Sequence, residues 1–328
     1  MRSLVYTAPG RMEMQEWPRR QCGDGEIEIA VAAAGICGAD ISGFWGRSRR
    51  RKAPLIFGHE VVGRRVDGQR VVADPLIGCG RCSECLGGAT NLCSGLRLLG
   101  MDGVAGCFAE FVIVLETQVY EIPDGLTDAQ AVLAEPLANV VHLFRLAGQL
   151  DVGPRFRMGI VGAGLMGSMA LQMAMRMGAD EVLVEDLDEV RLAAAREMGA
   201  TLAVSPETGE GRRFAGRGLD LVLDACGDGK ARQEAFDLCR TGGMVVLLGM
   251  ANEQSELDFG ASIRKEHRVL MSFGYTAEDF GRSLDLLVAG EIDLTGRIEE
   301  MPLEQGQRAF ERMTESRGST LKMVLRVA

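Results

Sequence analysis

The feature that most constrains this chain is a glycine-rich hexapeptide between an apolar run and a helix-like segment. The sequence GAGLMG follows the run that ends at Val161. In a strand–turn–helix unit the first glycine makes the turn, the second admits a pyrophosphate, and the third lets helix and strand pack closely. The hexapeptide therefore predicts a dinucleotide site at a helix N-terminus. Its predicted cofactor-binding residues are Gly162, Gly164, Leu165, Met166 and Gly167.

An acidic residue follows the motif at the spacing that such sites require. Asp186 ends the next apolar run, roughly twenty residues further on. A carboxylate at this position can bind both ribose hydroxyls and would repel a 2′-phosphate, so the sequence favours NAD over NADP. The nearby Arg191 leaves NADP open.

The block around the motif alternates apolar runs with helical patterns, which is typical of a parallel sheet built from strand–helix–strand units. Helices are expected at 165–177 and 189–198, each closed by a glycine. Six runs predict a doubly wound sheet. They are residues 158–161, 182–185, 202–204, 219–224, 244–249 and 269–273.

The rest of the chain predicts a second, β-rich domain. Valine-rich runs punctuated by glycine at 28–31, 61–66 and 111–115 indicate strands. After the parallel block we expect a helix from Thr276 with Asp279 completing its cap, a helix at 303–313 and a strand at 321–327. The predicted fold class is α/β. One domain comprises 1–147 and 274–328, and a dinucleotide-binding domain, 148–273, is inserted in it.

Composition excludes several classes of function. A formal net charge of -10 in 328 residues argues against nucleic acid or an anionic membrane as partner, because both reward a basic surface. The N-terminus lacks the apolar core of a signal peptide, and the longest uncharged stretch, 158–175, contains the glycine motif. The nine cysteines therefore suggest reduced thiols and metal ligation. A cytoplasmic protein with a small-molecule partner is the expectation.

Four of the cysteines predict a closed metal site. Cys79, Cys82, Cys85 and Cys93 are spaced C-x2-C-x2-C-x7-C in the segment 79–93. Four thiolates this close meet the tetrahedral demand of zinc, and neighbouring glycines let the backbone fold around so small a centre. Because sulfur occupies all four positions, the zinc has no place for a substrate. Its predicted role is structural.

Three further segments carry the ligand types of an open zinc site. They are GICGAD at 35–40, GHE at 58–60 and AEPL at 134–137. One thiolate, one imidazole and one carboxylate would leave a fourth position for water or an alcohol. Each segment alone is weak, because a single histidine is more often structural and Glu135 could simply begin a helix. Their occurrence beside the four-cysteine segment favours a catalytic zinc.

Taken in order, these motifs make the chain resemble the zinc-containing medium-chain dehydrogenases, in particular the branch of sorbitol and other polyol, threonine and galactitol-phosphate dehydrogenases. The resemblance extends over nearly the whole chain. It implies a GroES-like catalytic domain, a Rossmann domain and a cleft between them. It implies two zinc ions per chain, with Cys37, His59 and Glu135 holding the catalytic one. Glu60 would hydrogen-bond the zinc-bound water or replace it as ligand.

The same resemblance assigns further residues. Asp186 and Arg191 would hold the adenosine ribose, and Leu248, Gly249 and Met250 would pass near the nicotinamide. Homodimers or homotetramers would form through the Rossmann sheet near 247–250. The activity implied is NAD-dependent oxidation of a secondary alcohol in a polyol, cyclitol or sugar derivative.

The proton pathway departs from the family pattern. Family members commonly carry a hydroxyl two residues after the zinc cysteine and often a histidine five after it, where this chain has Ala39 and Ser42. Ser42 is a poor base alone. We therefore hypothesise that zinc-bound water, poised by Glu60, carries the proton.

Some segments leave alternatives open. The basic cluster Arg47, Arg49, Arg50, Arg51 and Lys52 could bind a substrate phosphate or carboxylate, although a solvated loop is favoured. The alternative substrates are therefore a sugar phosphate or an amino alcohol. A catalytically silent NAD- or zinc-binding protein is the alternative from another class. Phe44 and Trp45 could line a pocket or pack in the core, His142 is expected to pack, and His267 to be exposed.

Overall fold

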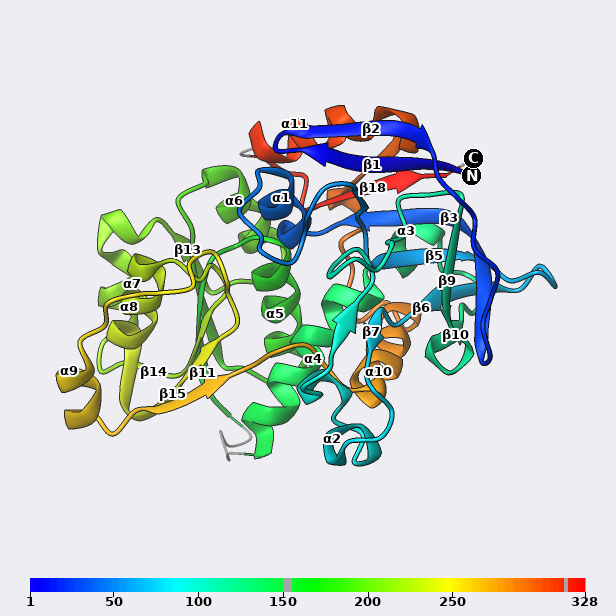
Figure 1. The fold of residues 1–328 in the computed structure, drawn as a ribbon. Helices are drawn as coiled ribbons and strands as arrows, with labels where there is room; N and C mark the ends of the chain where they lie inside the picture. Colours follow the sequence, from blue (N-terminus) through cyan, green and yellow to red (C-terminus); the bar gives the residue numbers. More distant parts are fainter. Residues whose placement is uncertain (150–154, 316–317, 328) are drawn as a thin grey trace. The chain divides into compact units, whose positions relative to one another are not determined.

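The computed structural model describes residues 1–149, 155–315 and 318–327 (Figure 1). The chain forms two compact units. The first comprises Met1–Ala138, Tyr275–Ser316 and Thr320–Ala328, and the second comprises Asn139–Gly274 and Arg317–Ser319. The predicted α/β fold class is confirmed: the first unit is rich in antiparallel strands, and the second is built on a parallel sheet.

The first unit contains three sheets. A seven-stranded sheet has the order β10-β6-β5-β3-β18-β17, with β9 also paired to β3. A three-stranded sheet has the order β2-β1-β4, and β7 pairs with β8. The strands are β1 (Arg2–Ala8), β2 (Arg11–Glu16), β3 (Glu26–Ile36), β4 (Leu55–Ile56), β5 (Glu60–Arg64), β6 (Arg70–Ala73), β7 (Leu76–Ile77), β8 (Arg97–Leu98), β9 (Phe111–Leu115), β10 (Val119–Glu121), β17 (Ile298–Pro302) and β18 (Lys322–Arg326).

Short helices connect and cover these sheets. They are α1 (Gly38–Phe44), α2 (Ser83–Leu86), α3 (Asp128–Ala131), α10 (Ala277–Val288) and α11 (Gly306–Glu315), with single 3-10 turns at Thr90–Leu92, Glu116–Gln118, Thr295–Arg297 and Leu303–Gln305. The helix α4 (Ala134–Gln149) begins in this unit and continues into the second unit from Asn139. The predicted start of α10 is confirmed, because Thr276 and Asp279 form a reciprocal capping box. The core of the unit lies between its sheets and α11, and Phe44, Phe57, Phe108 and Phe310 are buried there.

The second unit is a six-stranded parallel sheet of order β13-β12-β11-β14-β15-β16. Each predicted apolar run contributes to one of its strands, and the order is that of a doubly wound sheet. The runs 244–249 and 269–273 each extend two residues beyond the strand that they predict. The strands are β11 (Arg157–Val161), β12 (Glu181–Glu185), β13 (Leu202–Val204), β14 (Leu219–Asp224), β15 (Cys239–Leu247) and β16 (Arg268–Met271). The helices are α5 (Leu165–Arg176), α6 (Glu189–Glu197), α7 (Glu210–Ala215), α8 (Gly229–Leu238) and α9 (Phe259–Arg264), with a 3-10 turn at Pro206–Thr208.

The glycine hexapeptide forms the turn between β11 and α5. Gly162 has φ +106°, which side chains rarely tolerate, and a Cβ on Gly167 would lie 1.8 Å from the Gly162 carbonyl oxygen. Gly164 caps α5, and a Cβ there would meet no atom within 4 Å. The turn, the close packing and the open approach that the three glycines predict are all present.

No helix in the described residues is both long enough and apolar enough to span a membrane.

Candidate functional site

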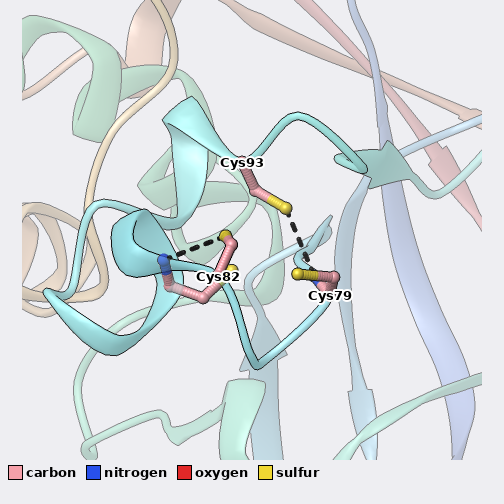
Figure 2. A group of neighbouring side chains, drawn as sticks. Cys79, Cys82 and Cys93 are labelled. Carbon is pink, nitrogen blue, oxygen red and sulfur yellow. Dashed lines mark hydrogen bonds between the residues drawn. The ribbon is translucent and has the colours of Figure 1, made fainter.

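The four clustered cysteines are gathered by one short loop of the first unit. Figure 2 labels three of them, Cys79, Cys82 and Cys93. Their sulfur atoms all lie within 4.8 Å of one another. Backbone groups hold the loop in shape: the Cys79 N–H donates to Cys93 Sγ at 3.4 Å, and the Cys85 N–H donates to Cys82 Sγ at 3.5 Å. A Cβ on Gly78 would lie 2.8 Å from Cys85 Sγ, so the missing side chain lets that sulfur approach the backbone.

A second group of metal-binding side chains is buried in the first unit. One ligand atom each from Cys37, His59 and Glu60 lies within 4.8 Å of the other two. Cys37 follows β3 and caps α1, whereas His59 and Glu60 stand at the start of β5. These strands pair antiparallel with Gly35 opposite Glu60. A Cβ on Gly35 would lie 1.8 Å from Glu60 Oε2, so glycine is what makes room for the carboxylate.

The Glu60 carboxylate is paired with a lysine that the sequence analysis missed. Lys322 Nζ donates to Glu60 Oε1 at 2.6 Å and to Oε2 at 2.7 Å, and both side chains are buried. It also donates to the Ile36 carbonyl oxygen at 3.2 Å. Burial alone would lower the pKa of Lys322, but the combined attraction of Glu60, Cys37 and Glu135 outweighs burial and the pKa is raised. The signal in the sequence was the cation Lys322 directly before the apolar run Met323–Leu325.

An aspartate behind His59 links the site to the basic cluster. Asp40, fully buried, accepts from the Cys37 N–H at 3.1 Å and from Arg51 Nη2 at 2.7 Å. Its Oδ1 lies 3.7 Å from His59 Nδ1, which has no hydrogen-bond partner within the described ranges. The solvated-loop interpretation is therefore wrong for Arg51, which is 4% exposed because it neutralises a buried carboxylate.

Glu135 is close to this group but is not one of the three side chains gathered within 4.8 Å. It lies in the first turn of α4 and is 7% exposed. Its Oε1 accepts a hydrogen bond of 3.0 Å from the hydroxyl of Tyr275, a buried residue that the sequence analysis also missed. Burial raises the pKa of the Glu135 carboxyl to about 7.

The donor set fits a divalent zinc ion. Thiolate, imidazole and carboxylate are all zinc ligands, and the burial of these side chains suits an ion held by the protein rather than a hydrated surface ion. Burial, reinforced by Glu60, raises the pKa of the Cys37 thiol to about 12. Were Cys37, Asp40, Glu60 and Glu135 all ionised, they would outnumber the cations Lys322 and Arg51 by two charges. One divalent cation would restore the balance and favour the thiolate.

In the second unit two of the predicted cofactor residues, Asp186 and Arg191, lie close to the glycine turn. Asp186 accepts from the Ala163 N–H at 2.7 Å and from the Asp188 N–H at 2.9 Å. The guanidinium of Arg191 lies 3.9 Å from the same carboxylate. These contacts fix the acidic side chain at the end of β12, beside the N-terminus of α5.

The segment Leu248–Met250 follows β15 and is fixed by β14. The N–H groups of Leu248 and Gly249 both donate to the Asp224 carbonyl oxygen, at 3.1 and 2.9 Å. Arg232, which the sequence analysis missed, donates to the carbonyl oxygens of Gly249 at 3.2 Å and Asn252 at 2.8 Å. Met250 itself is 77% exposed.

Other predictions have mixed outcomes. Ser42 is exposed on α1. Phe44 is a core residue, whereas Trp45 is 42% exposed and donates to Thr314. His142 is buried, as expected. The prediction for His267 is wrong: it is half-buried because its ring packs against Phe236 and approaches the Cys239 carbonyl oxygen at 3.4 Å.

Comparison with known proteins connects both units to one family. Residues 23–124 match the alcohol dehydrogenase GroES-like domain, and residues 166–289 match the zinc-binding dehydrogenase domain. Sorbitol dehydrogenase of Bacillus subtilis is 29% identical over 99% of this chain and 97% of its own length. L-threonine 3-dehydrogenase of the same organism is 32% identical over 88% of each chain.

A solved structure agrees with these sequence relatives. An alcohol dehydrogenase from Escherichia coli CFT073 in complex with NADH superposes with a TM-score of 0.89, at 27% identity over 99% of each chain. Matching family domains, related sequences and the same fold lead to one conclusion. The chain belongs to the zinc-containing medium-chain dehydrogenase family, with a GroES-like domain and a doubly wound cofactor domain, and is an NAD-dependent zinc oxidoreductase of the alcohol and polyol class.

Proposed function

We propose that this protein oxidises a secondary alcohol of a polyol, cyclitol or sugar derivative, with NAD as the hydride acceptor. The observation that carries the proposal is the buried group of Cys37, His59 and Glu60, with Glu135 beside it. Such a mixed set leaves a coordination position open, in contrast to four cysteines. Residues 1–147 and 274–328 would form the catalytic domain, and 148–273 the NAD-binding domain.

Two zinc ions per chain are part of the proposal. Cys79, Cys82, Cys85 and Cys93 would hold a structural ion. Cys37 and His59 would hold the catalytic ion, with a carboxylate from Glu135 or Glu60 as the third ligand. Zinc at such a site acts as a Lewis acid that stabilises the substrate oxygen as the alcohol is oxidised.

The protein's own residues would then orient the groups. Asp40 faces His59 Nδ1 and would fix the plane of the imidazole, as carboxylates do for zinc-binding histidines. Lys322 holds Glu60 in place through both of its oxygens. In the NAD-binding domain, the hexapeptide would bind the pyrophosphate, Asp186 and Arg191 the adenosine ribose, and Leu248–Met250 the nicotinamide end.

The proton of the substrate hydroxyl must leave the site without the hydroxyl and histidine relay that family members commonly carry. Ala39 offers no hydroxyl, and Ser42 is exposed. We assign the proton-handling role to Glu60, through water at the site. Glu60→Gln should reduce turnover while both zinc ions are retained. Full turnover of this variant across a pH series would contradict the assignment.

The activity itself is tested by a screen for NADH formation. Polyols, cyclitols, amino alcohols and sugar phosphates would be incubated with the zinc-loaded protein and NAD, with NADP in parallel. Absorbance of NADH should rise with at least one secondary alcohol and should be lost after chelation of the catalytic zinc. Failure of every compound in a broad panel, with zinc bound, would contradict the proposal.

A phosphorylated or acidic sugar is a second candidate substrate class. Arg47, Arg49 and Lys52 are exposed and have no ion-pair partner in the described residues, although they lie in a protein of net negative charge. Guanidinium groups bind phosphate and carboxylate well. Neutralising Arg47 and Arg49 together should raise KM for a sugar phosphate but not for a neutral polyol. Equal effects on both substrates would exclude this class.

We also propose that the protein forms homodimers or homotetramers through the parallel sheet. β16 is an edge strand of that sheet. Apolar side chains are exposed on and near it, including Met271 at 75%, Ile263 at 74% and Phe259 at 64%. An open edge beside an apolar surface favours pairing with a second copy. Light scattering should give at least twice the chain mass, and Met271→Lys should reduce it.

A further inference from the structure

We propose that Tyr275 is a positioning residue of the catalytic zinc site and that it acts by holding the Glu135 carboxylate. This inference rests on the proposed function, because it needs a metal at Cys37 and His59. Its basis is a hydrogen bond from the Tyr275 hydroxyl to Glu135 Oε1 at 3.0 Å between two buried side chains.

The position of Tyr275 is fixed by local rules that do not involve the metal. It directly precedes the capping box in which Thr276 and Asp279 start α10. Its ring packs against Phe280, with centroids 5.8 Å apart. Contact between the residue before an N-cap and the fourth helical residue is a hydrophobic staple, which sets the angle at which the chain enters a helix. The phenol is therefore placed before any ligand binds.

The same helix fixes the backbone at Glu135. Ser283 of α10, fully buried, donates to the Ala134 carbonyl oxygen at 2.8 Å. The start of α4 is thus contacted twice, at the backbone by Ser283 of α10 and at the carboxylate by Tyr275, which directly precedes the N-cap of that helix. The two contacts can be removed separately, which lets an experiment separate helix packing from control of the carboxylate.

Glu135 needs such a partner because of where it lies. The Glu135 carboxylate interacts electrostatically with Cys37, His59 and Glu60, so its orientation decides how it faces these groups. Hydrogen-bonded partners of metal ligands typically change metal affinity by about 10- to 100-fold when they are removed. Tyr275 reaches Glu135 from the side of α10 and would restrict the carboxylate to one orientation toward the metal.

The buried Asp74 is the competing partner for the phenol. The Tyr275 hydroxyl also favours the ionised form of Asp74, although burial still raises the pKa of that carboxyl to about 7. If Tyr275 acted mainly through Asp74, removing its hydroxyl would affect a protein that lacks the Glu135 carboxylate as much as the native one. A double-variant experiment can therefore decide which carboxylate matters.

The test compares two tyrosines that pack on the same phenylalanine. Tyr120 also contacts Phe280, at 4.8 Å between centroids, but its hydroxyl donates to the Ala277 carbonyl oxygen. Zinc release to a chelator would be followed in zinc-loaded Tyr275→Phe, Tyr120→Phe and Ser283→Ala. Tyr275→Phe should lose one zinc per chain about tenfold faster than the native protein, and the two control variants should not.

Two further measurements complete the test. With cobalt in the catalytic site, the visible absorption bands should shift in Tyr275→Phe, because the ligand geometry changes. Adding Tyr275→Phe to Glu135→Ala, which has no side-chain acceptor for the phenol, should then have no additional effect on zinc release. An unchanged release rate and cobalt spectrum, an additive effect in the double variant, or an equal effect of Ser283→Ala would each overturn the inference. A native protein that binds only one zinc per chain would instead refute the proposed function.

Discussion

The two metal-binding groups of the first unit are built in opposite ways. The four cysteines of residues 79–93 come from one loop, and two of them, Cys82 and Cys85, are only half-buried. The group of Cys37, His59 and Glu60 comes from two separate segments, one after β3 and one at the start of β5. Its Glu60 is paired with Lys322 of β18, and the neighbouring Glu135 accepts a hydrogen bond from Tyr275. The four ligands of the loop are close in sequence, whereas the partners of the buried group come from segments that are distant in sequence.

This difference has a physical cause. Four thiolates satisfy zinc completely, so a short loop with suitable turns is sufficient. An open site must bury ionisable side chains while one coordination position of the metal stays vacant. Each buried charge then needs an opposite charge or a hydrogen-bond partner. Lys322, Arg51 and Tyr275 provide those partners. We therefore expect loss of a zinc ligand in the loop to reduce mainly stability, and loss of a zinc ligand in the buried group to reduce mainly turnover.

The largest expected effect is that of Cys37→Ser. Loss of the thiolate should remove the catalytic zinc and reduce turnover at least about 1,000-fold, since Lewis-acid stabilisation is worth several kcal/mol. Zinc content should fall by one per chain with little change in melting temperature. Cys22→Ser, at an exposed free thiol, is the control. Retention of both zinc ions in Cys37→Ser would contradict the assignment of Cys37 as a ligand of a catalytic zinc that is separate from the loop zinc.

Cys93→Ser should show the opposite pattern. The loop would lose its zinc, and because metal binding and folding of a small site are coupled, the free energy of unfolding should fall by more than about 4 kcal/mol. Urea denaturation and zinc analysis would measure the two effects. The fraction that stays folded should still turn over substrate. Unaltered stability with lost activity would mean that the loop serves catalysis directly.

Lys322→Met tests whether the buried group depends on distant partners. Removing the lysine leaves Glu60 buried without its cation, which should cost about 3 kcal/mol of stability in the metal-free protein. Bound zinc should reduce that cost, since it supplies positive charge. Chemical denaturation with and without zinc gives both values. Combining Lys322→Met with Glu60→Gln should recover part of the loss, and no recovery would mean that Lys322 acts through packing alone.

The smallest expected effect comes from adding one methyl group. Gly35→Ala would place a Cβ 1.8 Å from Glu60 Oε2 and 2.6 Å from Val132, so the carboxylate must move at a cost of about 1–3 kcal/mol. The loss of catalytic zinc should accelerate while the loop zinc stays bound. Gly38→Ala is the matched control, because a Cβ there meets no atom within 4 Å. Equal zinc loss in the two variants would argue against steric placement of Glu60.

The sequence by itself determined the features that depend on neighbouring residues. Strand–turn–helix periodicity predicted the parallel sheet and the glycine turn, and cysteine spacing predicted the loop site. The capping box at Thr276 was also readable, because helix starts follow local hydrogen-bonding rules. The residue types at 37, 59, 60 and 135 also indicated a zinc centre, because the ability of a thiol, imidazole or carboxylate to bind zinc belongs to the side chain itself.

Only the tertiary structure decided which side chains support those residues. The pairing of β18 with β3 brings Lys322 to Glu60, and α10 brings Tyr275 to Glu135. Arg51 and His267 look like solvated charges in the sequence, yet packing places one in the core and half-buries the other. Such partners cannot be read from local patterns, because the charge that a buried group needs can come from any segment that the fold brings beside it.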